Sequence, residues 1–165
     1  MKKLLFLYIL FIFILSGCGI YNLNNFVLPD NIEFLALIEE LDTPEKICNY
    51  MLENFTYETN SILLNPYKLF ITKNGNCDDF SFFATFIAHY NNYETYQILI
   101  EFPLKKYHVI GVFKEGNYYN ISENLLYIEC FCENFREIMN FYFYKNWLSY
   151  NVYDYDMNIV EQIIK

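Results

Sequence analysis

Basic residues are scarce in this chain of 165 residues, in which 11 Lys and Arg stand against 20 Asp and Glu, giving a formal net charge of −9. Nucleic acids are bound largely through Lys and Arg on phosphates, and anionic lipid surfaces attract the same side chains. The charge balance therefore excludes nucleic acid as an expected partner and argues against a basic patch for membrane surfaces.

Cysteine is also too sparse, and present in the wrong number, to form a disulfide framework. The chain has five, of which Cys18 and Cys77 have separate interpretations below, and the remaining three cannot pair completely. We predict that Cys48, on the apolar face of an expected helix, is a buried core thiol. Cys130 and Cys132 form a C-x-C pair with no second pair or neighbouring histidine, which is a weak zinc pattern. We interpret them as core or incidental thiols.

The chain has no apolar run long enough to be a clear membrane span. The longest, Leu4 to Leu15, is too short for a bilayer core of roughly 30 Å. It follows Lys2 and Lys3 and ends at Leu15-Ser16-Gly17-Cys18. This pattern resembles the lipobox of a bacterial lipoprotein signal, so residues 1–17 are predicted to be a signal peptide and Cys18 the site of lipid attachment. A buried amino-terminal helix or an uncleaved membrane anchor are the alternatives.

The lipoprotein resemblance implies a location as well as a modification. In that family the cysteine receives a diacylglyceryl group, the signal is cleaved before it, and the new amino terminus is usually acylated, with palmitate among the acyl chains. The mature protein would then be lipid-anchored on the extracytoplasmic side of a bacterial cell membrane, inner or outer, with a formal charge of −11. Residues 18–30, which are rich in Asn, are expected to be a tether.

The remaining residues, 31–165, are long enough for one domain with one sizeable core. Apolar periodicity and turn residues predict mainly helices in the first half and strands in the second, which favours an α+β architecture over an alternating parallel one. The expected helices are 31–41, 44–55, 77–90 and 134–144 and a short final helix; the expected strands are 94–102, 107–114, 117–122 and 148–153.

The segment Gly75 to Ala84 places Cys77 at the first turn of the 77–90 helix. Gly75 and Asn76 interrupt whatever precedes, and apolar residues then recur at helical spacing. A helix amino terminus presents unpaired N–H groups and a partial positive charge, both of which favour thiolate over thiol. Cys77 is therefore a candidate nucleophile. Asp78 and Asp79 are interpreted as ordinary acidic partners of the helix dipole.

His108 is the candidate base for Cys77, because His89 lies about three turns further along the same helix, roughly 18 Å away. We expect His89 to be a surface or structural histidine. His108 lies near the start of a hairpin strand, and its cross-strand neighbours should be Ser122, Glu123 and Asn124. All three can accept a hydrogen bond from the imidazole. Glu123 alone carries a charge, but strand alternation could point it away.

These residues together resemble the transglutaminase-like domains, whose fold is related to that of papain-like cysteine proteases. The resemblance covers most of residues 31–165. It is carried by Thr43-Pro44-Glu45, Tyr57, the segment Gly75 to Ser81, His108 on a strand, and Gly116 to Ser122 on the next strand. It implies a central helix that carries the cysteine and packs on an antiparallel sheet.

The resemblance also implies a catalytic set of Cys, His and usually Asp, in that order along the chain. Cys77 and His108 match the first two positions. Ser122 stands where the family has Asp, and a serine cannot stabilise an imidazolium as a carboxylate does. Asn120 or Asn124 could replace it, since an asparagine orients the histidine in papain-like enzymes.

Two functions follow from these expectations. The first is a thiol hydrolase or acyl transferase that acts on a protein or peptide substrate, with water as acceptor in a peptidase or amidase and an amine as acceptor in cross-linking. The second, favoured by Ser122, is a lipid-anchored binding module that has lost turnover. No calcium-ligand cluster, phosphate loop or zinc spacing is visible, so no cofactor is assigned. The oligomeric state and the substrate are left open.

Overall fold

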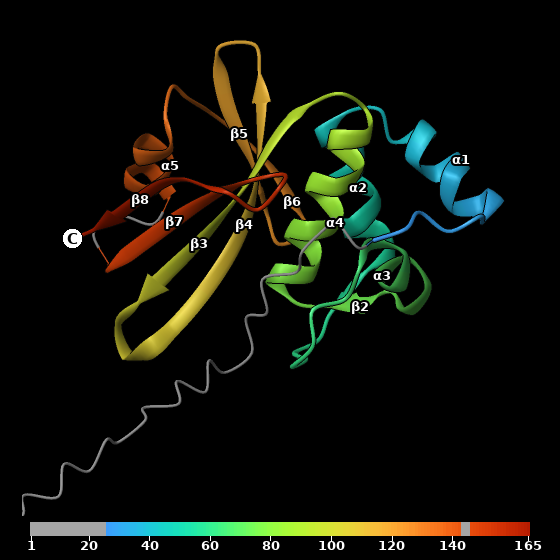
Figure 1. Ribbon diagram of the computed structural model, residues 1–165, viewed down its shortest axis with the longest axis horizontal. Coiled ribbons are helices and arrows are strands. Elements are labelled where there is room, and N and C mark those ends of the chain that lie inside the picture. The colour runs from blue at the N-terminus through green and yellow to red at the C-terminus, as the bar shows by residue number, and fades with distance from the viewer. Residues whose placement is uncertain (1–25, 143–145) are drawn as a thin grey trace, which may run out of the picture.

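The computed structural model of the chain describes residues 26–142 and 146–165. The first half of this part is mainly helical, and the second half is mainly strands (Figure 1). The elements are, in order, α1 (Ile32–Glu40), α2 (Pro44–Asn54), β1 (Thr56–Tyr57), α3 (Pro66–Thr72), β2 (Asn74–Gly75), α4 (Cys77–Tyr90), β3 (Glu94–Phe102), the 3₁₀ turn η2 (Pro103–Lys105), β4 (Lys106–Glu115), β5 (Tyr118–Glu123), β6 (Leu126–Cys132), α5 (Phe135–Tyr142), β7 (Ser149–Asp154) and β8 (Ile159–Ile164).

The strands of the second half form one antiparallel sheet in the order β6-β5-β4-β3-β7-β8. Helix α4 packs against β3 and β4 on one face of this sheet, with α1, α2 and α3 behind it, and α5 covers the opposite face (Figure 1). The expected α+β class is confirmed, and so is the expected packing of the Cys77 helix on an antiparallel sheet.

Each face of the sheet has its own apolar core. The core on the α4 side is rich in phenylalanine, and its fully buried members include Phe34, Phe80, Phe83 and Phe113. The core on the α5 side is mostly aliphatic, as Ile98, Ile110 and Val112 of the sheet meet Ile138 and Met139 of α5.

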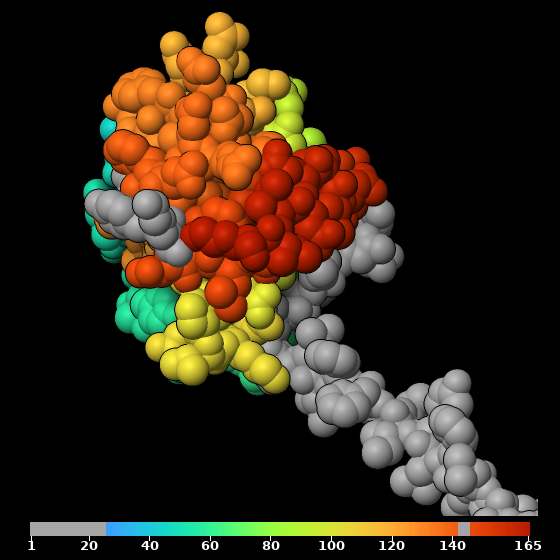
Figure 2. Space-filling model, turned by 90° about the vertical axis from the view of Figure 1, so that its left-hand side faces the viewer, coloured from blue at the N-terminus to red at the C-terminus, as the bar shows by residue number. Residues whose placement is uncertain are grey.

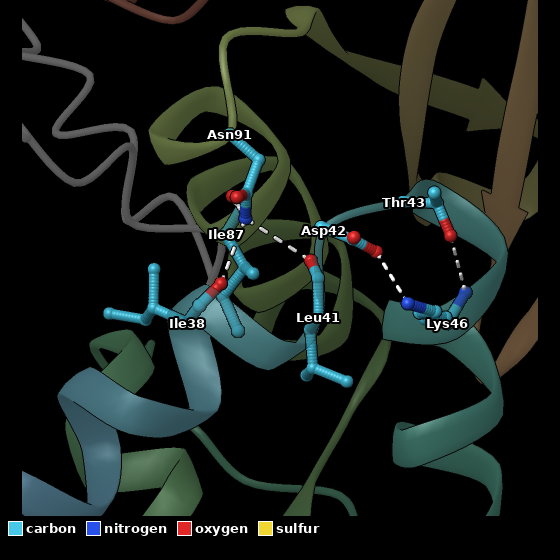
Figure 3. Close-up of polar contacts among 7 residues, drawn as sticks. All are labelled: Ile38, Leu41, Asp42, Thr43, Lys46, Ile87 and Asn91. Atoms are coloured by element: carbon cyan, nitrogen blue, oxygen red, sulfur yellow. Dashed lines mark hydrogen bonds and ion pairs between the residues drawn. The ribbon is translucent and has the colours of Figure 1, made fainter.

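Helix α4 is the central element, because the residues from Asp78 to Ala88 are all buried. Its carboxyl end is tied to α1 by the side chain of Asn91, whose Nδ2 donates to the carbonyl oxygens of Ile38 at 2.9 Å and Leu41 at 3.1 Å (Figure 3). The start of the next helix is fixed beside this contact, where Thr43 caps α2 and Asp42 pairs with Lys46 at 2.7 Å. These contacts hold α1 and α2 against α4.

Most predicted elements occur within one or two residues of their expected bounds, and the 77–90 helix and the 94–102 strand match them. The predicted short final helix is wrong, since Ile159–Ile164 is strand β8, paired antiparallel with β7. A short apolar run fits either structure, and the free edge of β7 decides between them. Helix α3 and strand β6 had no predicted counterpart.

None of the helices in residues 26–142 and 146–165 is long and apolar enough to cross a membrane. The predicted signal peptide, Cys18 and most of the predicted tether lie outside the residues that the structure describes.

Candidate functional site

Cys77 is the first residue of α4 and is half-buried. Asn76, just before it, has extended backbone and caps the helix, because its Oδ1 accepts from the N–H groups of Asp78 at 3.2 Å and Asp79 at 3.4 Å. At this first position a backbone N–H has no acceptor within the helix, so the thiol stands beside uncompensated positive dipole. The predicted placement of Cys77 at a helix amino terminus is confirmed.

Asp79 fixes the segment around the thiol. Its side chain is fully buried, and its Oδ2 accepts from the Asn76 N–H at 2.9 Å, completing a capping box. The same carboxylate accepts from Asn60 Nδ2 and from the Leu64 N–H, both at 2.6 Å. Asp79 therefore holds the loop before α3 against the start of α4, a larger structural role than that of a dipole partner.

His108 lies on β4 and contacts both the thiol and a carboxylate. Its Nε2 is 2.8 Å from Oε1 and 3.0 Å from Oε2 of Glu123. With Nε2 engaged there, Nδ1 is the nitrogen left for Cys77, with which the imidazole forms a hydrogen bond. Burial lowers the pKa of His108, but the hydrogen bonds with Cys77 and Glu123 outweigh burial and raise that pKa to about 9.

Ser122, the residue expected to hold the imidazole, faces elsewhere. It is buried, its Oγ donates to the Asn124 carbonyl at 3.2 Å, and it hydrogen-bonds with Cys48 of α2. Successive residues of a strand point to opposite faces, so Ser122 and the next residue, Glu123, diverge. The prediction that Ser122 is the partner of His108 is corrected: the carboxylate of Glu123 occupies that place.

The two asparagines considered as substitutes also have other roles. The Nδ2 of Asn124 donates to Glu123 Oε1 at 2.8 Å, so Asn124 orients the carboxylate instead of the imidazole. Asn120 is buried among Glu115, Tyr127 and the backbone of β6. The chain therefore places a Cys, a His and a Glu in contact, with Asn124 supporting the Glu.

Sequence reasoning had a signal for Glu123. It is the one charged residue among the three expected opposite His108, and a carboxylate is the group best suited to stabilise an imidazolium. The signal was offset by strand alternation counted from the hairpin turn. The printed pairing of β4 with β5 ends at Gly111 and Ser122, beyond which Asn124 has a positive φ of 52°, and simple alternation does not extend through such a residue.

Two further polar groups lie near the thiol. Asp78 is only 9% exposed, and its Oδ1 has no hydrogen-bond partner among the described residues. Burial and the neighbouring Asp79 raise the pKa of Asp78. The pKa of Tyr57 is raised by its burial and then by the nearby Cys77 and Asp78. Asp78 and Tyr57 thus border the site without belonging to the Cys77, His108 and Glu123 contact.

His89 lies in the last turn of α4, at the end opposite Cys77. Its ring stacks on Tyr155 with centroids 3.4 Å apart and an interplanar angle of 8°. Burial lowers the pKa of His89. The expectation of a structural histidine away from the site is confirmed.

Comparison with known proteins gives similar structures but no similar sequence. No protein-family model matches the chain, and no curated protein matches it. Three solved structures of LapG from Legionella pneumophila are similar: the calcium-bound form at 16% identity and a TM-score of 0.46, another at 17% and 0.45, and the EGTA-treated form at 13% and 0.48.

These similarities cover only part of each protein. The alignments include 58%, 56% and 71% of this chain and 64%, 62% and 71% of the respective LapG chains. This chain thus spans less than two thirds of the first two. Identities and scores of this size assign no substrate or activity to it.

Proposed function

We propose that this protein is a membrane-anchored, transglutaminase-like thiol hydrolase or acyl transferase, acting as a cysteine peptidase or amidase on protein or peptide substrates in the cell envelope. The observation that carries the proposal is the pair of contacts made by His108, with the carboxylate of Glu123 on Nε2 and the thiol of Cys77 on the other side. Nucleophile, base and orienting acid stand in the required sequence.

The proposed chemistry begins with a proton on His108. Because the raised pKa of His108 favours imidazolium at neutral pH, the proton of the Cys77 thiol can reside on the imidazole, leaving a thiolate beside a cation. The thiolate attacks an amide or ester carbonyl, and the leaving amine or alcohol takes the proton from His108 as the carbon–heteroatom bond breaks. This leaves an acyl-thioester on Cys77.

The second half-reaction regenerates the thiolate. His108 accepts a proton from water, whose oxygen attacks the thioester and releases the acid, or from an amine, which gives a cross-link. The N–H of Cys77 at the start of α4 is one proposed donor to the oxyanion. Glu123 would stabilise the imidazolium and hold its ring, as a carboxylate does in triads of this type.

One of the similar LapG structures is calcium-bound, which raises the question of a calcium site here. Calcium takes six to eight oxygen ligands, often carboxylates. Beside Cys77, Asp79 is already committed to Asn60, Leu64 and Asn76, and Asp78 Oδ1 is the uncommitted carboxylate oxygen. The described residues contain no group of three or more acidic, His or Cys side chains suited to a metal. The donors do not fit calcium, and no step is assigned to it.

The binding-module alternative has lost the observation that favoured it. It depended on a serine beside the imidazole, whereas the group there is the carboxylate of Glu123. The two functions differ in one measurable property, the reactivity of the Cys77 thiol.

The test is the pH dependence of Cys77 alkylation by iodoacetamide in the full chain, extracted in detergent, with each cysteine located by peptide mass. Iodoacetamide reacts with thiolate, so a preformed thiolate–imidazolium pair gives rapid reaction at pH about 6.5. We expect His108→Ala to slow it there by about tenfold or more, since base removal costs 10²–10⁴-fold in typical catalysts. Buried Cys48 is the internal reference for unreactive thiol.

Two outcomes are decisive. If Cys77 reacts no faster than an exposed model thiol at every pH and His108→Ala changes nothing, the enzyme proposal is wrong and the binding module stands. If the pair is assembled, hydrolysis of fluorogenic peptide and ester libraries, abolished in Cys77→Ser, identifies the substrate class.

A further inference from the structure

The outer strand β6 is bent at a defined place. Phe131 has a φ of +50° within the strand, and the β5–β6 register shifts between Tyr119, which pairs with Cys132, and Ile121, which pairs with Ile128. One residue of β5, Asn120, therefore stands opposite three of β6. This is a bulge, in which extra residues leave the regular ladder.

The bulge is held by a buried side chain. Asn120 is 4% exposed, and its Oδ1 accepts from the N–H of Cys130 at 3.1 Å and of Phe131 at 3.2 Å. Its Nδ2 donates to Glu115 at 2.8 Å and to the Tyr127 hydroxyl at 3.1 Å. With every Asn120 polar atom engaged, the bend is a fixed part of the fold.

The bend brings two thiols together. The thiols of Cys130 and Cys132 hydrogen-bond to each other, and the Cys130 Sγ also lies 2.9 Å from the Tyr119 carbonyl oxygen. In a regular strand, residues two apart have Cα atoms about 6.6–6.8 Å from each other, at the upper limit for a disulfide. The left-handed residue between the cysteines shortens that path, so the pair is arranged for a bond that a straight strand would strain.

The pair is accessible from one side. A surface groove of about 340 Å³ is lined by both cysteines and Phe131 of β6 and by Glu137, Asn140 and Phe141 of α5. Cys130 is half-buried at this groove, whereas Cys132 is 4% exposed. The face formed by β6, α5 and the β7–β8 hairpin is the one seen in Figure 2, in orange and red. An oxidant can therefore meet Cys130 first.

We propose that Cys130 and Cys132 are a redox site that closes reversibly to an intrachain disulfide by exchange with a disulfide donor. The Cys130 thiolate attacks one sulfur of the donor, whose S–S bond breaks and releases one thiol. The Cys132 thiolate then attacks the Cys130 sulfur and displaces the second donor thiol. Two cysteine thiols are oxidised, the donor disulfide is reduced to two thiols, and the two cysteine protons pass to those products.

The order of attack follows from the environment of the two sulfurs. Burial and the hydrogen bond with Cys130 raise the pKa of Cys132 to about 12, so Cys132 is suited to the second, intramolecular step. Cys48 has a similarly raised pKa of about 12, through burial, but its thiol lies in the apolar core on α2, beside Ser122. It serves as an internal control for a buried thiol without such a neighbour.

The experiment equilibrates the full chain, in detergent, with glutathione buffers of increasing oxidised-to-reduced ratio, then traps free thiols with N-ethylmaleimide. Mass spectrometry of the peptide containing residues 130–132 reports the result. We expect a form lighter by two hydrogen atoms that carries no maleimide and returns to a doubly alkylated form with dithiothreitol. Double alkylation at every ratio, stable glutathione adducts, or bonds to Cys48 or Cys77 would each overturn the proposal.

Two substitutions at Phe131, which is 58% exposed, test the role of the bend without disturbing the core. Asn adopts positive φ readily, whereas a β-branched residue strongly resists it. Phe131→Asn should therefore keep the disulfide equilibrium, and Phe131→Val should weaken it by about tenfold, given the usual penalty for a left-handed L-residue. Equal equilibria in both variants would refute the bend as its cause. None of these readouts depends on Cys77 reactivity.

Discussion

At the residue scale, the decisive contact is between His108 and Glu123, which join two neighbouring strands at the edge of the candidate site. Cys77 and His108 could be identified from sequence because each has a local signal: a helix start for the thiol, and a strand residue at hairpin distance for the imidazole. The third residue could not, because its orientation depends on a positive φ at Asn124 that no pattern in the sequence indicates.

The charge of Glu123 should be visible in the pH dependence of stability. The pKa of His108 is raised from 6.5 to about 9, so its contribution to folding is fully present below about pH 6.5 and is lost as pH rises through 9. Glu123→Gln removes one of the groups that raise this pKa. We expect the variant to be destabilised more at pH 6.5 than at pH 9, by about 1–2 kcal/mol, since one pKa unit corresponds to 1.36 kcal/mol.

Urea unfolding of both proteins at the two pH values measures this difference. Glu129→Gln, the same change at an exposed position of β6, is the matched control and should show no such pH dependence. Equal destabilisation of Glu123→Gln at pH 6.5 and pH 9 would show that the carboxylate does not hold the proton on His108.

At the element scale, sequence periodicity identified what packs strongly and missed what depends on partners. Helix 77–90 has a strong apolar pattern and a capping residue, Asn76, and both occur as predicted. Strand β8 and strand β6 are short, and their state is set by pairing with β7 and β5, which local sequence does not encode. Helix α3 begins at Pro66 after the cap Asn65, a start signal that was present but lay in a short segment.

The start of α4 gives a test with two adjacent aspartates in opposite situations. Asp79 accepts three hydrogen bonds in full burial, and an amide in its place would set a donor against a donor. We expect Asp79→Asn to cost about 2–4 kcal/mol, because hydrogen bonds to charged groups contribute about 1.5–3 kcal/mol each. Thermal or urea unfolding at neutral pH measures the loss.

Asp78→Asn is the matched control, one residue away in the same helical turn. Its Oδ1 has no partner among the described residues, and burial raises its pKa, which means that the ionised carboxylate is unfavourable there. The amide removes that penalty, so stability should stay within about 1 kcal/mol of the wild type or increase. A loss in Asp78→Asn as large as that in Asp79→Asn would contradict this account of the helix start.

At the scale of the whole molecule, the sheet places two chemistries on opposite sides. The Cys77 helix packs on one face, and the Cys130–Cys132 bulge lies at the outer strand, beside α5, which covers the other face (Figure 1). The strand order, with β3 central and β7 and β8 added on its far side, follows from long-range pairing. Sequence could give the α+β class through the succession of helices and strands, but not this order.

The proposed membrane anchor makes the last prediction. If Cys18 carries the lipid, Cys18→Ala should remove both fatty-acid labelling and membrane retention, because the mature chain has a formal charge near −11 and no basic patch to bind anionic lipid on its own. Metabolic labelling with an alkyne palmitate and detergent phase partitioning measure the two properties in cells. Cys48→Ala is the control, since Cys48 is buried on α2 and should leave both unchanged. An unlabelled wild-type chain, or a Cys18→Ala chain that still enters the detergent phase with label, would show that the amino-terminal segment is not a lipoprotein signal.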